Sequence, residues 1–366
     1  MMYTGSIWRR FDFVLFGTTL LLIIFGIMMI ASATTNAIDP DLISRVPDQI
    51  LYAVIGLVLV FVLTAVDYRL LGGVHNWLYL LILGLLVLVL ALGVVGEAGA
   101  QRWINVGIRI QPSEIGKIVI IITLGQLLST QYQNMNSFMT VIISLVHVAI
   151  PASLVFIQPN LGTTIVFGII WFSMAWAAGL KLRHIGFMVL TLLIIAPVAF
   201  TQLEDYQKGR IITFLLPDSD PDAQFNIRQA LISIGNGGLS GLGYANGTQS
   251  QLRFLRVRHT DFIFSVIAEE FGFLGGVVVM IALAIIILRI LKGARTASDP
   301  LGSLICYGVA AIIFFQTTVS IGMNLNLIPV TGLTLPFISS GGTSLLSMLA
   351  GIGLAESVIV RRRRIA

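Results

Sequence analysis

This 366-residue chain has few charged residues and almost no cysteine, and each shortage excludes a class of protein. Charged residues make up 11% of the sequence, whereas soluble globular domains carry about 25%. The single cysteine, Cys306, excludes a disulfide framework and says nothing about the redox compartment. The net charge is +5, but the basic residues are not interleaved with exposed aromatic residues, so nucleic acid is not an expected partner. Anionic lipid headgroups are the better counterpart of this charge.

What the chain has in abundance is apolar sequence, since hydrophobic residues make up 57% of it. They form successive stretches of about twenty residues, each long enough to cross a hydrocarbon layer about 30 Å thick. The expected fold class is therefore all-α: a polytopic membrane protein with about ten transmembrane helices, in one integral membrane domain over residues 1–366. The expected spans are residues 13–35, 49–66, 75–95, 112–129, 139–157, 161–179, 185–203, 261–291, 302–322 and 340–360.

The distribution of Lys and Arg between the short loops predicts the orientation. A cytoplasmic N-terminus places one set of basic residues inside: Arg9, Arg10, Arg69, Lys181, Arg183, Lys292, Arg295 and Arg361–Arg364. Both termini are therefore expected in the cytoplasm, and the long connection 204–260, between the seventh and eighth spans, is expected outside. The first apolar run, Phe13–Ile30, exceeds the roughly 7–15 residues of a signal-peptide core, which favours an uncleaved first span.

The 204–260 connection is unusually basic for an external loop. Its basic residues are Lys208, Arg210, Arg228, Arg253, Arg256 and Arg258. External loops generally avoid an excess of Lys and Arg, so this cluster predicts an anionic ligand on the outer face. Two amphipathic pieces of the loop, Ile211–Leu216 and Phe225–Ile234, are too short to span and are expected at the membrane surface.

Asp261 stands where this connection joins the eighth span, and two interpretations are open. An aspartate at a helix start can cap the helix, because its carboxylate accepts hydrogen bonds from the first-turn amides. The neighbouring His259, Thr260 and basic side chains instead favour proton transfer on the anionic ligand. A cap needs no such neighbours, so the second interpretation is favoured.

Other polar residues extend this site. Glu114 and Lys117 lie three apart on one face of the fourth span, as a static ion pair or as part of a polar pathway. Arg45, Arg102 and Arg109 complete the external cations, and the guanidinium group suits phosphate oxygens. The amides of the glycine-rich stretches 235–247 and 339–342 could cradle an anion, although glycine is also common in packed membrane helices.

Several motifs together resemble the SEDS family (shape, elongation, division and sporulation). They are Ala100-Gln101-Arg102-Trp103-Ile104, Gln111-Pro112-Ser113-Glu114, Gly237-Gly238-Leu239-Ser240-Gly241-Leu242-Gly243, Gly247-Thr248-Gln249-Ser250-Gln251, His259-Thr260-Asp261-Phe262-Ile263-Phe264 with Ala268-Glu269-Glu270, and Pro336-Phe337-Ile338-Ser339-Ser340-Gly341-Gly342. The stretch 247–251 resembles the elongation branch, RodA, more than the division branch, FtsW. Two positions depart from the family pattern: Asn160 replaces a frequent aspartate, and Arg256-Val257 replaces a Pro-Glu pair.

The resemblance implies a peptidoglycan glycosyltransferase of the bacterial cytoplasmic membrane. Such an enzyme polymerises lipid II, an undecaprenyl-pyrophosphate-linked disaccharide-peptide, into β-1,4-linked glycan strands on the outer face, with inversion. It serves cell elongation and rod-shape maintenance. The implied partners are a class B penicillin-binding protein and other membrane proteins of the elongation complex. By motif position, Asp261 corresponds to the family's essential aspartate.

The chemistry of this reaction fits the residues that are present. An attacking hydroxyl needs one base, and a leaving pyrophosphate needs positive charge and no proton donor. Asp261 is therefore predicted to be the general base, and Glu114 to orient Lys117. The predicted substrate contacts are Arg45, Arg102, Arg109, Glu114, Lys117, Arg210, Gln249, His259, Thr260, Ser339, Ser340 and Gly341. A divalent cation, Mg²⁺ or Mn²⁺, could share the neutralisation, but no ligand spacing establishes one.

Three other functions remain as alternatives. A lipid II flippase would use the same membrane groove, but it needs a polar path and no base. A non-catalytic scaffold for a penicillin-binding protein would use Asp261 as a helix cap only. Another polyprenyl-phosphate glycosyltransferase, such as an O-antigen ligase, is disfavoured by the motif resemblance alone.

Overall fold

The computed structural model describes residues 8–35, 39–95, 101–105, 109–131, 137–216, 221–255 and 257–362. Each of the ten expected spans coincides with a helix: α2 Phe13–Ala33, α4 Arg45–Ala65, α6 His75–Leu92, α7 Pro112–Thr130, α8 Phe138–Ile157, α9 Leu161–Ala177, α10 Leu182–Thr201, α14 Ile263–Thr296, α15 Pro300–Asn324 and α16 Gly342–Val360. By length and composition, eight helical stretches in the described residues can cross a membrane, and α9 is a shorter apolar helix. The all-α, polytopic membrane fold is thereby confirmed.

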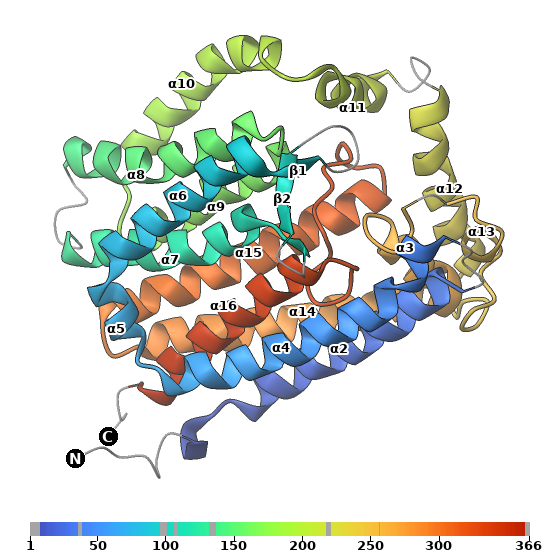
Figure 1. Ribbon diagram of the computed structural model, residues 1–366, viewed down its shortest axis with the longest axis horizontal. Helices are drawn as coiled ribbons and strands as arrows, with labels where there is room; N and C mark the ends of the chain where they lie inside the picture. The colour runs from blue at the N-terminus through green and yellow to red at the C-terminus, as the bar shows by residue number, and fades with distance from the viewer. Residues whose placement is uncertain are drawn as a thin grey trace.

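Helix α16 lies in the middle of the bundle and packs against α4, α7, α14 and α15 (Figure 1). From Ser347 to Val360 every residue of α16 is buried. The outer helices instead expose large apolar side chains, such as Leu21 of α2, Val58 of α4 and Leu80 of α6. Helices that are apolar on their outer faces suit a lipid environment, where all backbone polar groups must be satisfied within the helix.

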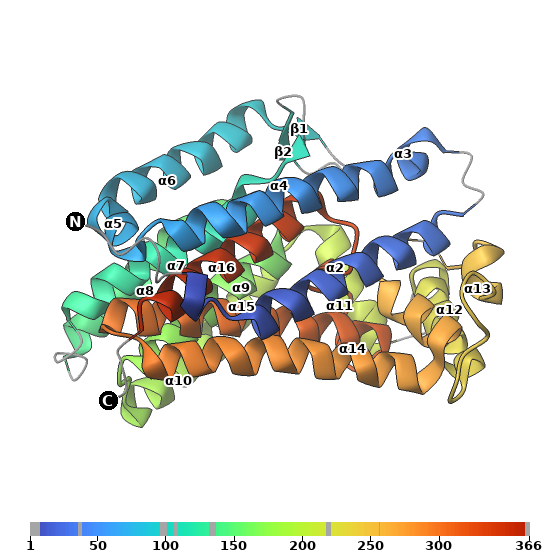
Figure 2. The same ribbon diagram turned by 90° about the horizontal axis from the view of Figure 1, so that it is seen from below.

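The first and last described segments meet at one end of the bundle. The short helix η1, Trp8–Arg10, precedes α2, and Arg10 Nη1 donates to the Arg362 carbonyl at 3.3 Å. Arg289, near the end of α14, forms an ion pair of 2.6 Å with Asp12. Helices α12 and α13 lie at the opposite end in both views (Figures 1 and 2). The first and last described residues therefore lie at the same end of the bundle, away from α12 and α13.

The connection between α10 and α14 is more helical than the sequence predicted. It forms α11 Asp205–Leu215, α12 Pro221–Gly237 and α13 Thr248–Gln251. Helix α11 begins earlier than expected because Glu204 and Gln207 form a capping box. Helix α12 begins at Pro221, a residue suited to the first turn. Figure 1 shows α10 and α11 forming an arch that leads to α12. Arg256, one of the predicted basic residues, lies outside the described residues, as do Arg363 and Arg364.

A small antiparallel sheet between α6 and α7 was not predicted. It consists of β1 Val94–Val95, β2 Gln101–Asn105 and β3 Arg109–Ile110, in the order β1-β2-β3. Helix α6 ends before the expected residue 95 because Gly93 adopts an extended conformation. In the pairing of β2 with β3, Asn105 lies opposite Arg109. The sheet therefore places Arg109 directly before the start of α7.

Helix α14 is interrupted at Gly272, whose φ of 67° and ψ of −166° are not helical. A glycine-rich segment, Gly237–Gly243, passes across this break, and we call it the glycine clasp. It exchanges four backbone hydrogen bonds with α14: Leu242 N to Glu269 O (3.0 Å), Gly243 N to Glu270 O (2.9 Å), Phe273 N to Gly238 O (2.9 Å) and Leu274 N to Leu239 O (3.2 Å). Groups that would have paired within α14 are thus satisfied by the clasp, as an apolar environment demands.

The glycines of the clasp are needed for this close approach. A Cβ atom on Gly237 would lie 1.8 Å from the Ala268 carbonyl oxygen, and one on Gly241 would lie 2.2 Å from the Glu270 carbonyl oxygen. The expectation that these amides could cradle an anion is therefore wrong for Leu242 and Gly243, whose N–H groups bind α14.

Candidate functional site

Asp261 and Arg210 converge on Gly332, in the loop between α15 and α16. A Cβ atom on Gly332 would lie 3.9 Å from Asp261 Oδ2 and 3.7 Å from Arg210 Nη1. Arg210 belongs to α11, and its Nη1 also donates to the Val330 carbonyl at 3.2 Å. The structure therefore brings the predicted base together with one predicted cation, although they come from different elements.

The start of α14 is capped by Asn324 of α15. The N-cap residue of α14, Phe262, makes no side-chain capping hydrogen bond. Instead, the first-turn amide of Ser265 donates to Asn324 Oδ1 at 3.0 Å. The Asn324 Nδ2 donates to the Asp261 carbonyl at 2.8 Å. Asn324 thus caps α14 at the Ser265 amide, and the choice between the two interpretations of Asp261 stays a prediction.

The segment Ser339–Gly341 supports the backbone that leads to Asp261. Ser339 Oγ donates to the Thr260 carbonyl at 2.9 Å, and Ser340 N donates to the His259 carbonyl at 2.9 Å. Gln49 of α4 fixes the segment in turn, because its side chain binds Ser339 O and Gly341 N at 3.3 Å each. These contacts bring five predicted residues together: His259, Thr260, Ser339, Ser340 and Gly341.

His259 is neutral at pH 7 in this environment. Burial first, and then the charges of Arg45 and Arg258, together lower its pKa to about 4. Arg45 is the first residue of α4, one turn before Gln49. Arg258 is buried and donates to the carbonyls of Ala33 and Leu255. Arg45 therefore adds positive charge beside His259, while Arg258 anchors the loop to the end of α2.

Arg109 joins the site through its backbone. Its carbonyl oxygen accepts hydrogen bonds from the Tyr52 hydroxyl at 2.9 Å and the Thr343 hydroxyl at 3.1 Å. The Gln111 amide also donates to Thr343 Oγ1, at 3.3 Å. Strand β3 is thereby fixed to the first turn of α16, directly after Gly341.

Arg102 is held at the turn between α8 and α9. Its guanidinium donates to the Gln158 carbonyl at 3.0 Å and also to the Pro159 carbonyl. Asn160 accepts a hydrogen bond from the Thr163 amide at 3.3 Å, so it caps α9. The predicted contact of Arg102 with substrate stays a prediction.

Glu114 and Lys117 form the predicted ion pair inside α7. Lys117 Nζ lies 2.6 Å from Glu114 Oε2, and the Lys117 side chain is completely buried. The pair therefore marks the face of α7 that points into the protein. Glu114 and Lys117 are thus paired, and a contact of Lys117 with substrate stays a prediction.

Gln249 is positioned by a carboxylate of α14. Glu269 accepts hydrogen bonds from Gln249 N at 2.8 Å, from Ser250 N at 3.2 Å and from the Thr248 hydroxyl at 3.3 Å. Glu270 accepts one from the Ser32 hydroxyl of α2. Both glutamates therefore hold neighbouring segments against α14.

Two further features concern ligands. Among the described residues, no three His, Cys, Asp or Glu side chains are grouped so that they could hold a metal ion.

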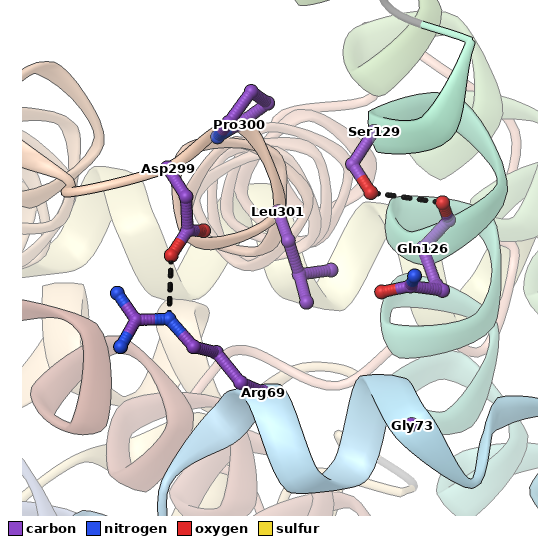
Figure 3. Close-up of a pocket in the computed structure, with 7 residues that line it drawn as sticks. All are labelled: Arg69, Gly73, Gln126, Ser129, Asp299, Pro300 and Leu301. Atoms are coloured by element: carbon purple, nitrogen blue, oxygen red, sulfur yellow. Dashed lines mark hydrogen bonds and ion pairs between the residues drawn. The ribbon is translucent and has the colours of Figure 1, made fainter.

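A cavity of about 410 Å³ is lined by Arg69, Gly73, Gln126, Ser129, Asp299, Pro300 and Leu301 (Figure 3). This cavity lies at the first turn of α15, whereas Asp261 contacts Asn324 at the last turn of the same helix. The two ends of a helix of this length are roughly 35 Å apart. This cavity is therefore separate from the Asp261 site.

Sequence reasoning missed several residues that build the site, namely Gln49, Tyr52, Asn324, Gly332 and Thr343. Asn324 and Gln49 had one available signal: each is a polar amide at the end of an apolar run that predicts a helix. Gly332 had another, because it follows Pro329-Val330-Thr331 in a connection without apolar runs. Neither signal indicates which residues these positions contact.

Comparison with known proteins assigns the family. The family model for FtsW, RodA and SpoVE, described as "Cell cycle protein", matches residues 12–364. The chain belongs to this family. It is 36% identical to the peptidoglycan glycosyltransferase MrdB of Escherichia coli (strain K12), over 95% of this chain and 94% of that protein. It is 35% identical to the stage V sporulation protein E of Bacillus subtilis (strain 168), over 95% and 96% of the two chains.

Solved structures of the family have the same fold. The crystal structure of the rod shape determining protein RodA of Thermus thermophilus superposes with a TM-score of 0.73 at 28% identity, over 98% of this chain and 99% of that one. A chain from a study of "polymerization and crosslinking by a peptidoglycan synthase complex" gives a TM-score of 0.79 at 28% identity, over 97% and 99%.

Proposed function

We propose that this protein polymerises lipid II into glycan strands, with Asp261 as general base and Arg210 opposite the leaving pyrophosphate. One observation carries the proposal, the convergence of Asp261 Oδ2 and Arg210 Nη1 on Gly332. The activity itself, peptidoglycan glycosyltransferase, agrees with the names of relatives that match nearly the whole chain at 36% and 34% identity.

The reaction is a single displacement. A hydroxyl oxygen of the acceptor sugar attacks the anomeric carbon of the donor, and Asp261 takes the hydroxyl proton. The new glycosidic bond forms as the bond between the anomeric carbon and the phosphate oxygen breaks. The electron pair of that bond leaves with the undecaprenyl pyrophosphate. Because the attack comes from the face opposite the leaving group, the product is inverted, a β-1,4 linkage.

Positive charge is the main help that the leaving group needs, because pyrophosphate is already a weak base. A preorganised guanidinium close to the developing charge lowers the barrier most, and Arg210 is suited to this role. We propose Arg45, Arg102, Arg109 and Lys117 as further contacts to pyrophosphate or saccharide. A bound Mg²⁺ or Mn²⁺, held by one carboxylate and the substrate phosphates, is the alternative source of charge.

We also propose the orientation and the partners. The end of the bundle that carries Arg10 and Arg362 would face the cytoplasm, since basic short loops generally stay inside, and Asp261 would face outside. The structural similarity to a chain from a peptidoglycan synthase complex supports a class B penicillin-binding protein as the partner. Residues 1–366 would act as one membrane domain in the elongation complex of rod-shaped cells.

The test is polymer formation from purified lipid II in detergent, analysed on a gel with and without the penicillin-binding partner. Asp261→Asn should fold and bind the partner but make no polymer. Arg210→Gln should lower kcat by about 10²–10³-fold, while Arg210→Lys, which keeps the charge, should lower it less. Normal polymer from Asp261→Asn would refute the assignment of the base. Transport has no meaning in detergent, so polymer formation there also excludes a flippase or a scaffold as the sole function.

A further inference from the structure

Asn324 is completely buried at the last turn of α15, and every hydrogen-bonding position of its side-chain amide is used. Its Oδ1 accepts from Ser265 N at 3.0 Å and from Ser265 Oγ at 2.7 Å. Its Nδ2 donates to Asp261 O at 2.8 Å and to Ser320 O at 2.7 Å. An amide offers two acceptor and two donor positions, so this side chain is fully satisfied.

The partners fix which way the amide points. The Ser265 N–H can only donate, so it requires the oxygen of Asn324. The carbonyls of Asp261 and Ser320 can only accept, so they require the NH₂ group. Turning the amide over would place two donors together and leave two carbonyls facing an oxygen. The side chain is therefore locked between the first turn of α14 and the backbone of Asp261.

These hydrogen bonds of Asn324 separate two roles, helix capping and proton transfer, that an aspartate at a helix start would otherwise combine. The first-turn amides of a helix attract a carboxylate, and the helix dipole stabilises its charged form. A carboxylate used in that way has a lowered pKa and is a weaker base. Asn324 satisfies the Ser265 amide with a neutral group, and the Asp261 carboxylate lies instead beside Gly332 and Arg210.

We propose that Asn324 is a positioning residue for Asp261. It caps α14 in place of Asp261 and holds the Asp261 carbonyl, so that the carboxylate is directed to the reacting hydroxyl. This inference rests on the proposed function, in which Asp261 is the general base. Asn324 itself touches neither substrate nor the reacting atoms in this scheme.

The test compares two substitutions that separate capping from positioning. Asn324→Asp keeps an oxygen for the Ser265 amide but loses the donors to Asp261 O and Ser320 O. Asn324→Ala loses both sets of bonds. Asn326→Asp, two residues further along, is the matched control, because it makes the same charge change outside the hydrogen-bond network. Each variant is measured for thermal unfolding, for kcat and KM with lipid II, and for the pH dependence of kcat/KM.

We expect Asn324→Asp to unfold at a lower temperature than the wild type, because its second carboxyl oxygen faces the carbonyls of Asp261 and Ser320, and to lose about 10²-fold in kcat, as for a catalytic group displaced by about 1 Å, with little change in KM. The acid limb of its kcat/KM profile, where activity falls as the base becomes protonated, should move to higher pH. The reason is that a second carboxyl group nearby raises the pKa of Asp261. In Asn324→Ala the Asp261 carboxylate becomes available to the α14 amides, so kcat should fall and the acid limb should move to lower pH. Asn326→Asp should behave as the wild type.

The outcomes distinguish this inference from the proposed function. If Asp261→Asn still makes polymer, the assignment of the base fails, whatever Asn324 does. If Asp261→Asn is inactive but both Asn324 variants keep the wild-type kcat and pH profile, only the positioning role fails. If Asn324→Asp does not fold, Asn324→Ala decides the outcome, and a wild-type kcat and pH profile of that variant would contradict the inference.

Discussion

Arg210 Nη1 and Asp261 Oδ2 lie within 4 Å of one point, the position that a Cβ atom on Gly332 would occupy. The arginine comes from a surface helix and the aspartate from the mouth of a membrane helix. In the proposed reaction these two groups, the base and the cation, would both act beside Gly332. The following predictions test this arrangement and the parts of the fold that support it.

Gly332→Ala should disturb the site and the backbone together. Gly332 has a φ of 73°, where an L-residue costs about 1–2 kcal/mol, and the new methyl group would be in van der Waals contact with Arg210 and Asp261. Gly179→Ala is the matched control, because Gly179 has a φ of 101° and its Cβ would contact nothing. Both variants should lose similar stability in thermal unfolding, but only Gly332→Ala should lose polymerase activity. Equal activity of the two would show that Gly332 does not border the reaction.

The buried pair in α7 can be separated into a structural and a substrate-binding part. Lys117→Met leaves the Glu114 carboxylate buried without its cation, which should destabilise the protein by about 3–5 kcal/mol. The double variant Glu114→Gln/Lys117→Met removes both charges and should recover most of this loss. If Lys117 contacts pyrophosphate, the double variant will be stable yet inactive in the lipid II assay. A stable and active double variant would assign the pair to packing alone.

The glycine clasp should tolerate no side chain at Gly237. Its Cβ atom would lie 1.8 Å from the Ala268 carbonyl, and overpacking of this kind costs about 1–3 kcal/mol or more. Gly235, one half-turn earlier in α12, has open space at its Cβ position. Gly235→Ala should therefore keep or raise stability, by up to about 1 kcal/mol. Comparing the unfolding temperatures and yields of the two variants tests the clasp directly.

His259 should make the protein less stable in acid. Its pKa is about 6.5 when unfolded and about 4 in the folded protein, chiefly because of burial. Between these values the unfolded chain binds the extra proton, so stability is complete above pH 6.5 and falls as the pH drops towards 4. The loss is at most about 3 kcal/mol. His259→Gln should show a flatter dependence of unfolding temperature on pH, and an unchanged slope would assign the acid sensitivity elsewhere.

The sequence predicts the spans well because membrane helices are specified by local composition. Each expected span coincides with a helix. Glu114 and Lys117 could be predicted as a pair because they share one helix face. The role of the connection between α10 and α14 was harder to predict. A glycine-rich segment has the same composition whether its amides bind an anion or pair with an interrupted helix. Asn324 could not be predicted as the partner of Asp261, because the two are 63 residues apart and a buried amide does not reveal its partner. Arg210 was the one basic residue of the 204–260 connection predicted to contact substrate, but only the fold shows that it lies near Asp261.

The clasp across the break at Gly272 is built from peptide groups, so it specifies the shape of the main chain and leaves most side chains there open to change. Substitution at Leu239, Ser240 or Leu242 keeps all four of those hydrogen bonds, whereas a methyl group at Gly237 or Gly241 collides with α14. Evolutionary drift in this segment should therefore be rapid between the glycines and slow at them. A spacing pattern of glycines would then identify distant homologues after the intervening letters have diverged.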